Sequence, residues 1–253
     1  MRIRLRLFYI FSFIILNTSS EAQYSIKDSS IAFPMIGAVI GYQFPGGDIA
    51  DRFGSNYNVG GVFQWKTKSN WVFGIEGQFI FGDNVKETNV IDNLLTSDGH
   101  IIDANGNYAE LTFEERGLAL YVKAGKIFSF GKPNRNSGIF TSLSLGYLKH
   151  KIRIDTPGSP VPYLQDDYNK GYDRLCSGLA FSELIGYMYL SNNRLINFYA
   201  GFEFTQAFTK NRREVNFDTG TSDHSSRTDL LSGIRLGWVF PIYKRVADKS
   251  YYY

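Results

Sequence analysis

Residues 69–84 (SNWVFGIEGQFIFGDN) alternate strictly between two kinds of side chain. The odd-numbered positions from Trp71 to Phe81 are aromatic, aliphatic or glycine, whereas the even-numbered positions are mostly small or polar and include Glu76. Successive side chains of a β-strand point to opposite faces, so this stretch predicts a strand with one apolar face. A soluble sheet would bury that face in its core, whereas a membrane barrel would turn it to lipid and enclose the glutamate.

The same period of two recurs along the chain and predicts eight strands. These strands are 32–44, 57–66, 69–84, 116–128, 138–154, 174–190, 195–209 and 228–243. Aromatic residues make up 16% of the 253 residues, and aromatic side chains favour strands. Most of the predicted strands are long enough to cross a membrane at a tilt.

The connections between the predicted strands alternate in length. Three are short and polar (67–70, 131–136 and 191–194), and four are long (45–56, 83–115, 155–173 and 210–227). A soluble β-sandwich, the alternative, gives no reason for this alternation, whereas outer-membrane barrels combine short periplasmic turns with long outer loops. In lipid the sheet must also close, because every backbone polar group needs a partner. The sequence therefore predicts an all-β, eight-stranded antiparallel transmembrane β-barrel of the bacterial outer membrane, with both mature termini periplasmic.

The N-terminus is typical of a signal peptide. Arg2, Arg4 and Arg6 precede an apolar run at 7–16 that is too short to span a bilayer, and small residues at Ser20 and Ala22 predict cleavage before Gln23. The predicted organisation is a signal peptide at 1–22, a barrel at 23–243 and a periplasmic tail at 244–253. The single cysteine, Cys176, excludes a disulfide framework and a cysteine-based metal site, and the net charge of +3 is too small to indicate nucleic-acid binding.

Four charged residues fall on predicted inner faces: Glu76, Lys123, Glu203 and Arg235. The interior of an eight-stranded barrel is just wide enough for side chains to fill it. An unpaired buried charge costs several kcal/mol, so two acids and two bases in this space are expected to pair. We expect a structural cluster that closes the lumen; a proton or ion path is the alternative.

Glu183 does not fit this pattern. Strict alternation places it on the same face as Phe181 and Ile185, where a carboxylate would meet the bilayer at a high cost. A β-bulge near Ser182 would turn Glu183 inward and add a fifth inner charge. A position close to the membrane interface is the other interpretation, and the sequence leaves both open.

Catalytic and metal sites find little support in the sequence, so no catalytic residue, metal or cofactor is predicted. The three histidines, His100, His150 and His224, fall in or near predicted outer loops, and the residues around His224 are those of a solvated loop. The segment 103–107 shares part of the pattern of a calcium loop but lacks its spacing and its final glutamate. Asn105-Gly106 better predicts a hairpin that extends the third and fourth strands beyond the membrane as a rigid outer surface.

The chain continues past the last predicted strand as KRVADKSYYY. Tyr251, Tyr252 and Tyr253 at its end are the candidates for a docking tail that adds to the sheet or groove of a partner. A tail without a partner is the alternative.

The strings KGYDRL (170–175), FSELIGYMYLSNNRLINFYAGFEFTQAFT (181–209) and LLSGIRLGWVFPIYKR (230–245) resemble uncharacterised outer-membrane barrel proteins of the Bacteroidota lineage. The architecture is similar to small barrels of the OmpA and OmpX type. The resemblance implies a role like that of PorG-like accessory barrels of type IX secretion, or of outer-membrane assembly complexes.

We therefore expect a non-enzymatic structural or accessory subunit of such a complex, which docks through its outer loops and its periplasmic tail. Its expected partners are outer-membrane lipids and other outer-membrane or periplasmic proteins, and not nucleic acid. A narrow pore or small-solute carrier and a lipid-modifying enzyme are the two alternatives.

Overall fold

The computed structural model describes residues 29–165, 167–191 and 195–242. The predicted signal peptide and the predicted tail with its three tyrosines lie outside the described residues. Their assignments stay predictions.

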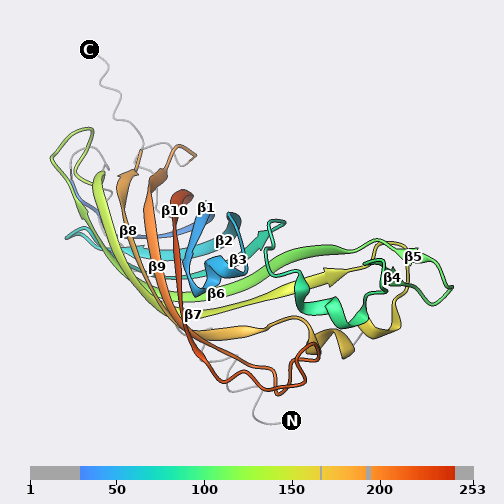
Figure 1. Ribbon diagram of the computed structural model, residues 1–253. Helices are drawn as coiled ribbons and strands as arrows, with labels where there is room; N and C mark the ends of the chain where they lie inside the picture. The colour runs from blue at the N-terminus through green and yellow to red at the C-terminus, as the bar shows by residue number, and fades with distance from the viewer. Residues whose placement is uncertain (1–28, 166, 192–194, 243–253) are drawn as a thin grey trace, which may run out of the picture.

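Eight long strands form a closed antiparallel barrel (Figure 1). They are β1 (Phe33–Gly47), β2 (Asn56–Lys66), β3 (Trp71–Gly82), β6 (Thr112–Phe128), β7 (Gly138–Asp155), β8 (Cys176–Tyr189), β9 (Phe198–Asn211) and β10 (Ser226–Pro241). Each strand pairs with the next in the chain, and β10 closes onto β1. The predicted eight-stranded antiparallel barrel is confirmed, and each strand lies within a few residues of its predicted range.

The apolar faces of the strands point away from the barrel. In β3, Phe73 and Ile75 are exposed. Glu76, the next residue along the strand, is buried with 3% of its surface exposed. A barrel of eight strands has a narrow interior, so the larger number of bulky side chains must lie outside. The alternation in 69–84 is therefore that of a barrel wall with an apolar exterior and an inner face that encloses Glu76 and Gln78.

Two clusters of buried hydrophobic side chains fill the molecule. One fills the lumen near the short turns and includes Phe33, Met35, Phe140 and Tyr199. The other begins in the lumen and continues into the long loops, where Val90, Ile91, Ile101, Val161 and Leu164 are buried. The long loops thus have a hydrophobic core of their own that is continuous with the interior of the barrel.

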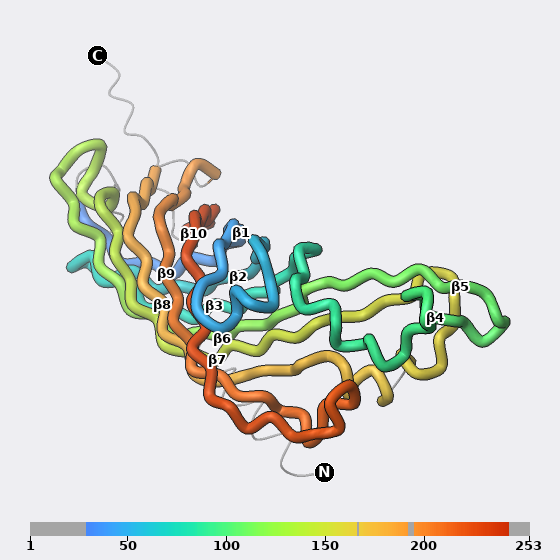
Figure 2. The backbone as a smooth tube through the Cα atoms, viewed as in Figure 1, coloured from blue at the N-terminus to red at the C-terminus, as the bar shows by residue number. Residues whose placement is uncertain are grey.

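The long loops and the ends of β6 and β7 form an extension at one end of the barrel (Figure 2). The pairing of β6 with β7 runs on to Thr112 and Asp155. The extension also holds a two-stranded sheet of β4 (Ile101–Ile102) and β5 (Tyr108–Ala109). It contains the three 3-10 helices η2 (Asn89–Leu94), η3 (Pro162–Leu164) and η4 (Tyr168–Gly171). A further 3-10 helix, η1 (Asp48–Asp51), directly follows β1. Among the described residues, no helix is long and apolar enough to cross a membrane.

The hairpin predicted around Asn105-Gly106 is present, but its predicted relation to the barrel strands is wrong. β4 and β5 form a separate sheet instead of extending the third and fourth strands. β3 ends at Gly82, and the chain then enters η2, whose Val90 and Ile91 are buried in the loop core. Burial of these side chains draws the chain away from β3, so β6 continues outward paired with β7.

Candidate functional site: the filled lumen and the linked outer loops

Four strands bring the predicted inner charges together in the middle of the lumen. Glu76 comes from β3, Lys123 from β6, Glu203 from β9 and Arg235 from β10. Arg235 donates from Nη1 to Glu76 and from Nη2 to Glu203 Oε2, the latter at 2.5 Å. Lys123 Nζ lies 2.6 Å from Glu76 Oε2. All four side chains are buried, so the pairs replace the water that each charge loses.

Side chains around this charge cluster complete the filling of the lumen. Gln78 donates a hydrogen bond to Glu76 Oε1 at 2.7 Å. The ring of Tyr199 lies below Lys123, with its centroid 6.0 Å from Nζ. A Cβ on Gly237 would lie 2.2 Å from Tyr199 Cε1, so glycine is needed there for the ring to enter the lumen. The strands therefore supply small residues where the large interior side chains need space.

Glu183 is not part of the charge cluster. It lies on the outer face of β8 with Phe181 and Ile185, and its cross-strand partners are Leu143 and Phe204. The bulge that would turn it inward is absent from β8, because the pairing with β9 continues one residue at a time through Ser182, Glu183 and Leu184. The interpretation of Glu183 as an inner charge is wrong, and Glu183 faces outward near the middle of the strand.

A second buried polar group, which the sequence did not predict, lies in the half of the lumen near the long loops. His150 lies in β7, five residues before the strand ends at Asp155, and its side chain is buried in the lumen. Its Nε2 lies 3.0 Å from Asp229 Oδ2, and Thr209 donates to the same oxygen at 2.6 Å. The alternation in β7 and β10 places His150 and Asp229 on inner faces. Their contact across the lumen cannot be predicted from the sequence of either strand alone.

Lys66 closes the end of the lumen near the short turns. The sequence did not predict a role for this residue. Its ammonium group donates to Asn136 Oδ1 at 2.7 Å and to the carbonyl of Ile31 at 3.0 Å. Asn136 in turn accepts from the backbone N–H of Ile31 at 3.1 Å. The segment before β1 is thereby fixed across this end of the barrel.

One ion-pair network joins all four long loops at the other end. Glu87 of the second loop accepts from Arg52 of the first loop and from Arg174 of the third, both at 3.0 Å. Arg174 also binds Asp218 of the fourth loop, at 2.6 Å and 3.0 Å. Burial disfavours the charge of Arg174, but these carboxylates raise its pKa above the ordinary value. Cys176 takes part through its Sγ, to which Arg52 donates at 3.0 Å.

The loop segments that were weighed as chemical sites have structural roles. Asp103 Oδ1 accepts from the backbone N–H groups of Asn107 and Asn105, at 2.8 Å and 2.9 Å, and these hydrogen bonds lower its pKa. The carboxylate thus closes the hairpin turn. Asp223, beside His224, accepts from Ser225 and Arg227. Among the described residues, no cluster of His, Cys, Asp and Glu has the arrangement to hold a metal ion.

No family model matches the chain, and no curated protein matches it. Two crystal structures of Ail, the attachment invasion locus protein of Yersinia pestis, are similar. One is 11% identical with a TM-score of 0.36; the other, in complex with the heparin analogue sucrose octasulfate, is 13% identical with a TM-score of 0.34. Each alignment covers 82% of this chain and 99% of Ail. The outer membrane protein OprG from Pseudomonas aeruginosa is 10% identical with a TM-score of 0.33, over 86% of this chain and 99% of OprG. The assignment of a closed barrel therefore follows from the pairing of this protein's own strands.

Proposed function

We propose that this protein is a non-enzymatic integral barrel of the bacterial outer membrane that carries a rigid external platform. In this account it serves as a structural or accessory subunit of an outer-membrane secretion or assembly complex, as the resemblance to Bacteroidota barrels suggests. The observation that carries the proposal is the ion-pair network of Arg52, Glu87, Arg174 and Asp218, because it fixes all four long loops to one another.

The outer surface of the wall supports the membrane location. Large apolar side chains such as Leu120 on β6 and Phe202 on β9, each 69% exposed, point outward from the barrel. Lipid would cover them, whereas water would leave a large apolar surface exposed. β1 begins and β10 ends at the end of the barrel that carries the short turns. Short turns are periplasmic in such barrels, so both termini belong to the periplasm in this proposal.

The lumen and the loops favour a subunit that binds over one that transports. Buried side chains occupy the lumen from Phe33 at one end, through Arg235 in the middle, to His150 near the other end. The linked loops and their hydrophobic core form a preordered surface. A preordered surface loses less conformational entropy when a partner binds, which favours docking.

The test is co-purification of partners from native outer membranes in mild detergent. An affinity tag inserted at the exposed Gly158 leaves the C-terminal tail free. Glu87→Gln removes the carboxylate shared by Arg52 and Arg174, and Asp98→Asn serves as the matched control in the same loop. The proposal predicts stoichiometric partners with the wild-type protein and with Asp98→Asn, and a loss of at least about tenfold with Glu87→Gln.

Recovery of the wild-type barrel alone would contradict the accessory role and would favour an independent pore or a lipid-modifying enzyme. Partners retained equally by Glu87→Gln would contradict docking through the linked loops. Heat-modifiable mobility of each variant on a gel shows that its barrel has folded, so that lost partners are not confused with lost structure.

A further inference from the structure

A carboxylate lies in the outer wall of the barrel, near the middle of β8. Glu183 is exposed there between Leu143 on β7 and Phe204 on β9. Among the described residues, none forms a hydrogen bond or an ion pair with it. If the barrel is embedded as proposed above, this carboxylate meets hydrocarbon. Ionisable side chains at such depth are costly and normally have a partner of opposite charge.

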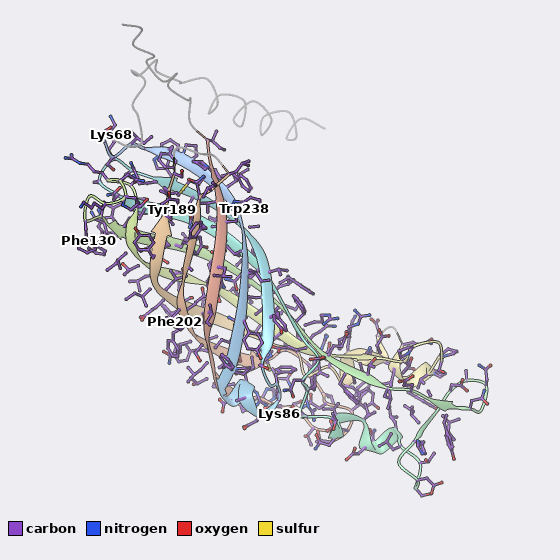
Figure 3. All side chains as sticks on the ribbon, turned by 90° about the horizontal axis from the view of Figure 1, so that it is seen from above. Lys68, Lys86, Phe130, Tyr189, Phe202 and Trp238 are labelled. Carbon is purple, nitrogen blue, oxygen red and sulfur yellow. The ribbon has the colours of Figure 1, made fainter. Side chains whose placement is uncertain are left out.

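The wall beside Glu183 is hollowed into a groove of about 820 Å³. Small outward residues, Ala124, Thr141 and Ser232, form low points between large ones. Phe202, which lines the same groove, points away from the barrel (Figure 3). The groove therefore combines an apolar surface, space for side chains of a partner and one negative charge.

Within the part of the chain that the structure describes, no outward cation of the barrel strands lies beside Glu183. Lys126 lines the same groove, but it lies toward the short-turn end of β6, where its Nζ sits 4.8 Å from the ring centroid of Trp71. Lys149 and Arg153 face outward near the opposite end of β7. Two copies in one membrane share an axis along the membrane normal, so residues meet others of similar depth. A second copy would thus bring no cation from these positions to Glu183.

We infer that this groove is a lateral docking site for a membrane-spanning segment of another protein, which places a Lys or Arg side chain against Glu183. The inference rests on the proposed membrane location but concerns a different surface from the outer loops. Charge complementarity carries it: Glu183 has no cationic partner among the residues that the structure describes, because the one cation that lines the groove, Lys126, lies against Trp71. A desolvated ion pair with good geometry compensates a charge that lipid cannot solvate. Apolar side chains around Glu183 exclude water from the pair.

The test is site-specific photo-crosslinking in native membranes. A photoreactive phenylalanine analogue replaces Phe204 beside Glu183, and the same analogue at Phe63 is the control. Phe63 is similarly exposed, at 46% against 44% for Phe204, and it lies on β2, opposite β8 in the barrel. We expect a crosslink from position 204, and not from position 63, to a membrane-spanning segment that contains Lys or Arg.

The charge is then tested directly. Glu183→Gln in the same background is expected to reduce the crosslink at least tenfold. Glu183→Lys, combined with Glu in place of the cation of the crosslinked segment, is expected to restore it. The purified Glu183→Gln barrel is expected to melt at the same temperature as the wild type or higher, because Glu183 has no partner within the barrel.

Four results would overturn the inference. These are a crosslink to a second copy, a crosslink to lipid alone, no crosslink from position 204, and a crosslink that Glu183→Gln leaves unchanged. A lower melting temperature for Glu183→Gln would also contradict it, because Glu183 would then stabilise the barrel itself. Wild-type protein missing from the outer-membrane fraction would instead refute the proposed membrane location, so the two failures are distinguishable.

Discussion

At the scale of single residues, the interior is organised around Arg235. Its guanidinium group is fully buried, yet it has two carboxylate partners on two other strands, Glu76 and Glu203. Desolvation of a charge is costly, so the cluster is stable only as a complete set. Removal of one member leaves a charge that neither water nor lipid reaches.

Glu203→Leu should therefore destabilise the barrel by about 3 kcal/mol, because Arg235 then shares Glu76 with Lys123 and lacks its own partner. The measurement is the denaturant midpoint of the refolded protein in detergent, together with heat-modifiable mobility. Gln206→Leu is the control, since Gln206 lies in the same strand but on the outer face, and it should leave the midpoint unchanged or raise it. Equal midpoints for Glu203→Leu and the wild type would contradict the structural role of the cluster.

Alternation in the sequence predicted which charges face inward but not how the interior is completed. Glu76 and Arg235 could be assigned to the lumen from their own strands. The contact between His150 and Asp229 and the closure by Lys66 could not, because they depend on the stagger of strands around the barrel and on the path of the segment before β1.

At the scale of elements, the wall has a regular period of two that continues through β8 without a bulge. The sequence predicted the strands well, since outward aromatic and inward small residues mark each one. It did not predict that the hairpin of β4 and β5 forms a sheet separate from the barrel. That outcome depends on Val90 and Ile91 finding a hydrophobic core formed by other loops, which is a tertiary effect.

The outward face of β9 gives a direct test of this period. Phe202→Asp places a charge on a face that lipid covers in our proposal, and it should destabilise the inserted barrel by about 2 kcal/mol. The amount of folded, heat-modifiable protein in the outer-membrane fraction should fall accordingly. Phe202→Leu is the control and should insert normally. Normal membrane levels of Phe202→Asp would contradict the assignment of this face to lipid.

At the scale of the whole molecule, the barrel and the extension form one continuous interior. The hydrophobic cluster that contains Ile80 and Leu148 in the barrel also contains Val161 and Leu164 in the loops. Lys68 and Phe130 mark the short-turn end, and Lys86 lies near the junction with the extension (Figure 3). In our proposal the barrel is the membrane anchor and the extension is an external platform, and this arrangement suits a docking subunit better than a channel.

The central claim is that the lumen is closed, and electrical recording from purified wild-type protein in a planar bilayer tests it most directly. A conducting porin added to the same bilayer shows that the membrane registers open channels. We predict no current steps from the wild-type protein, because Glu76, Lys123, Glu203 and Arg235 occupy the middle of the lumen. Reproducible single-channel steps of uniform size would contradict the account and would establish the protein as a pore.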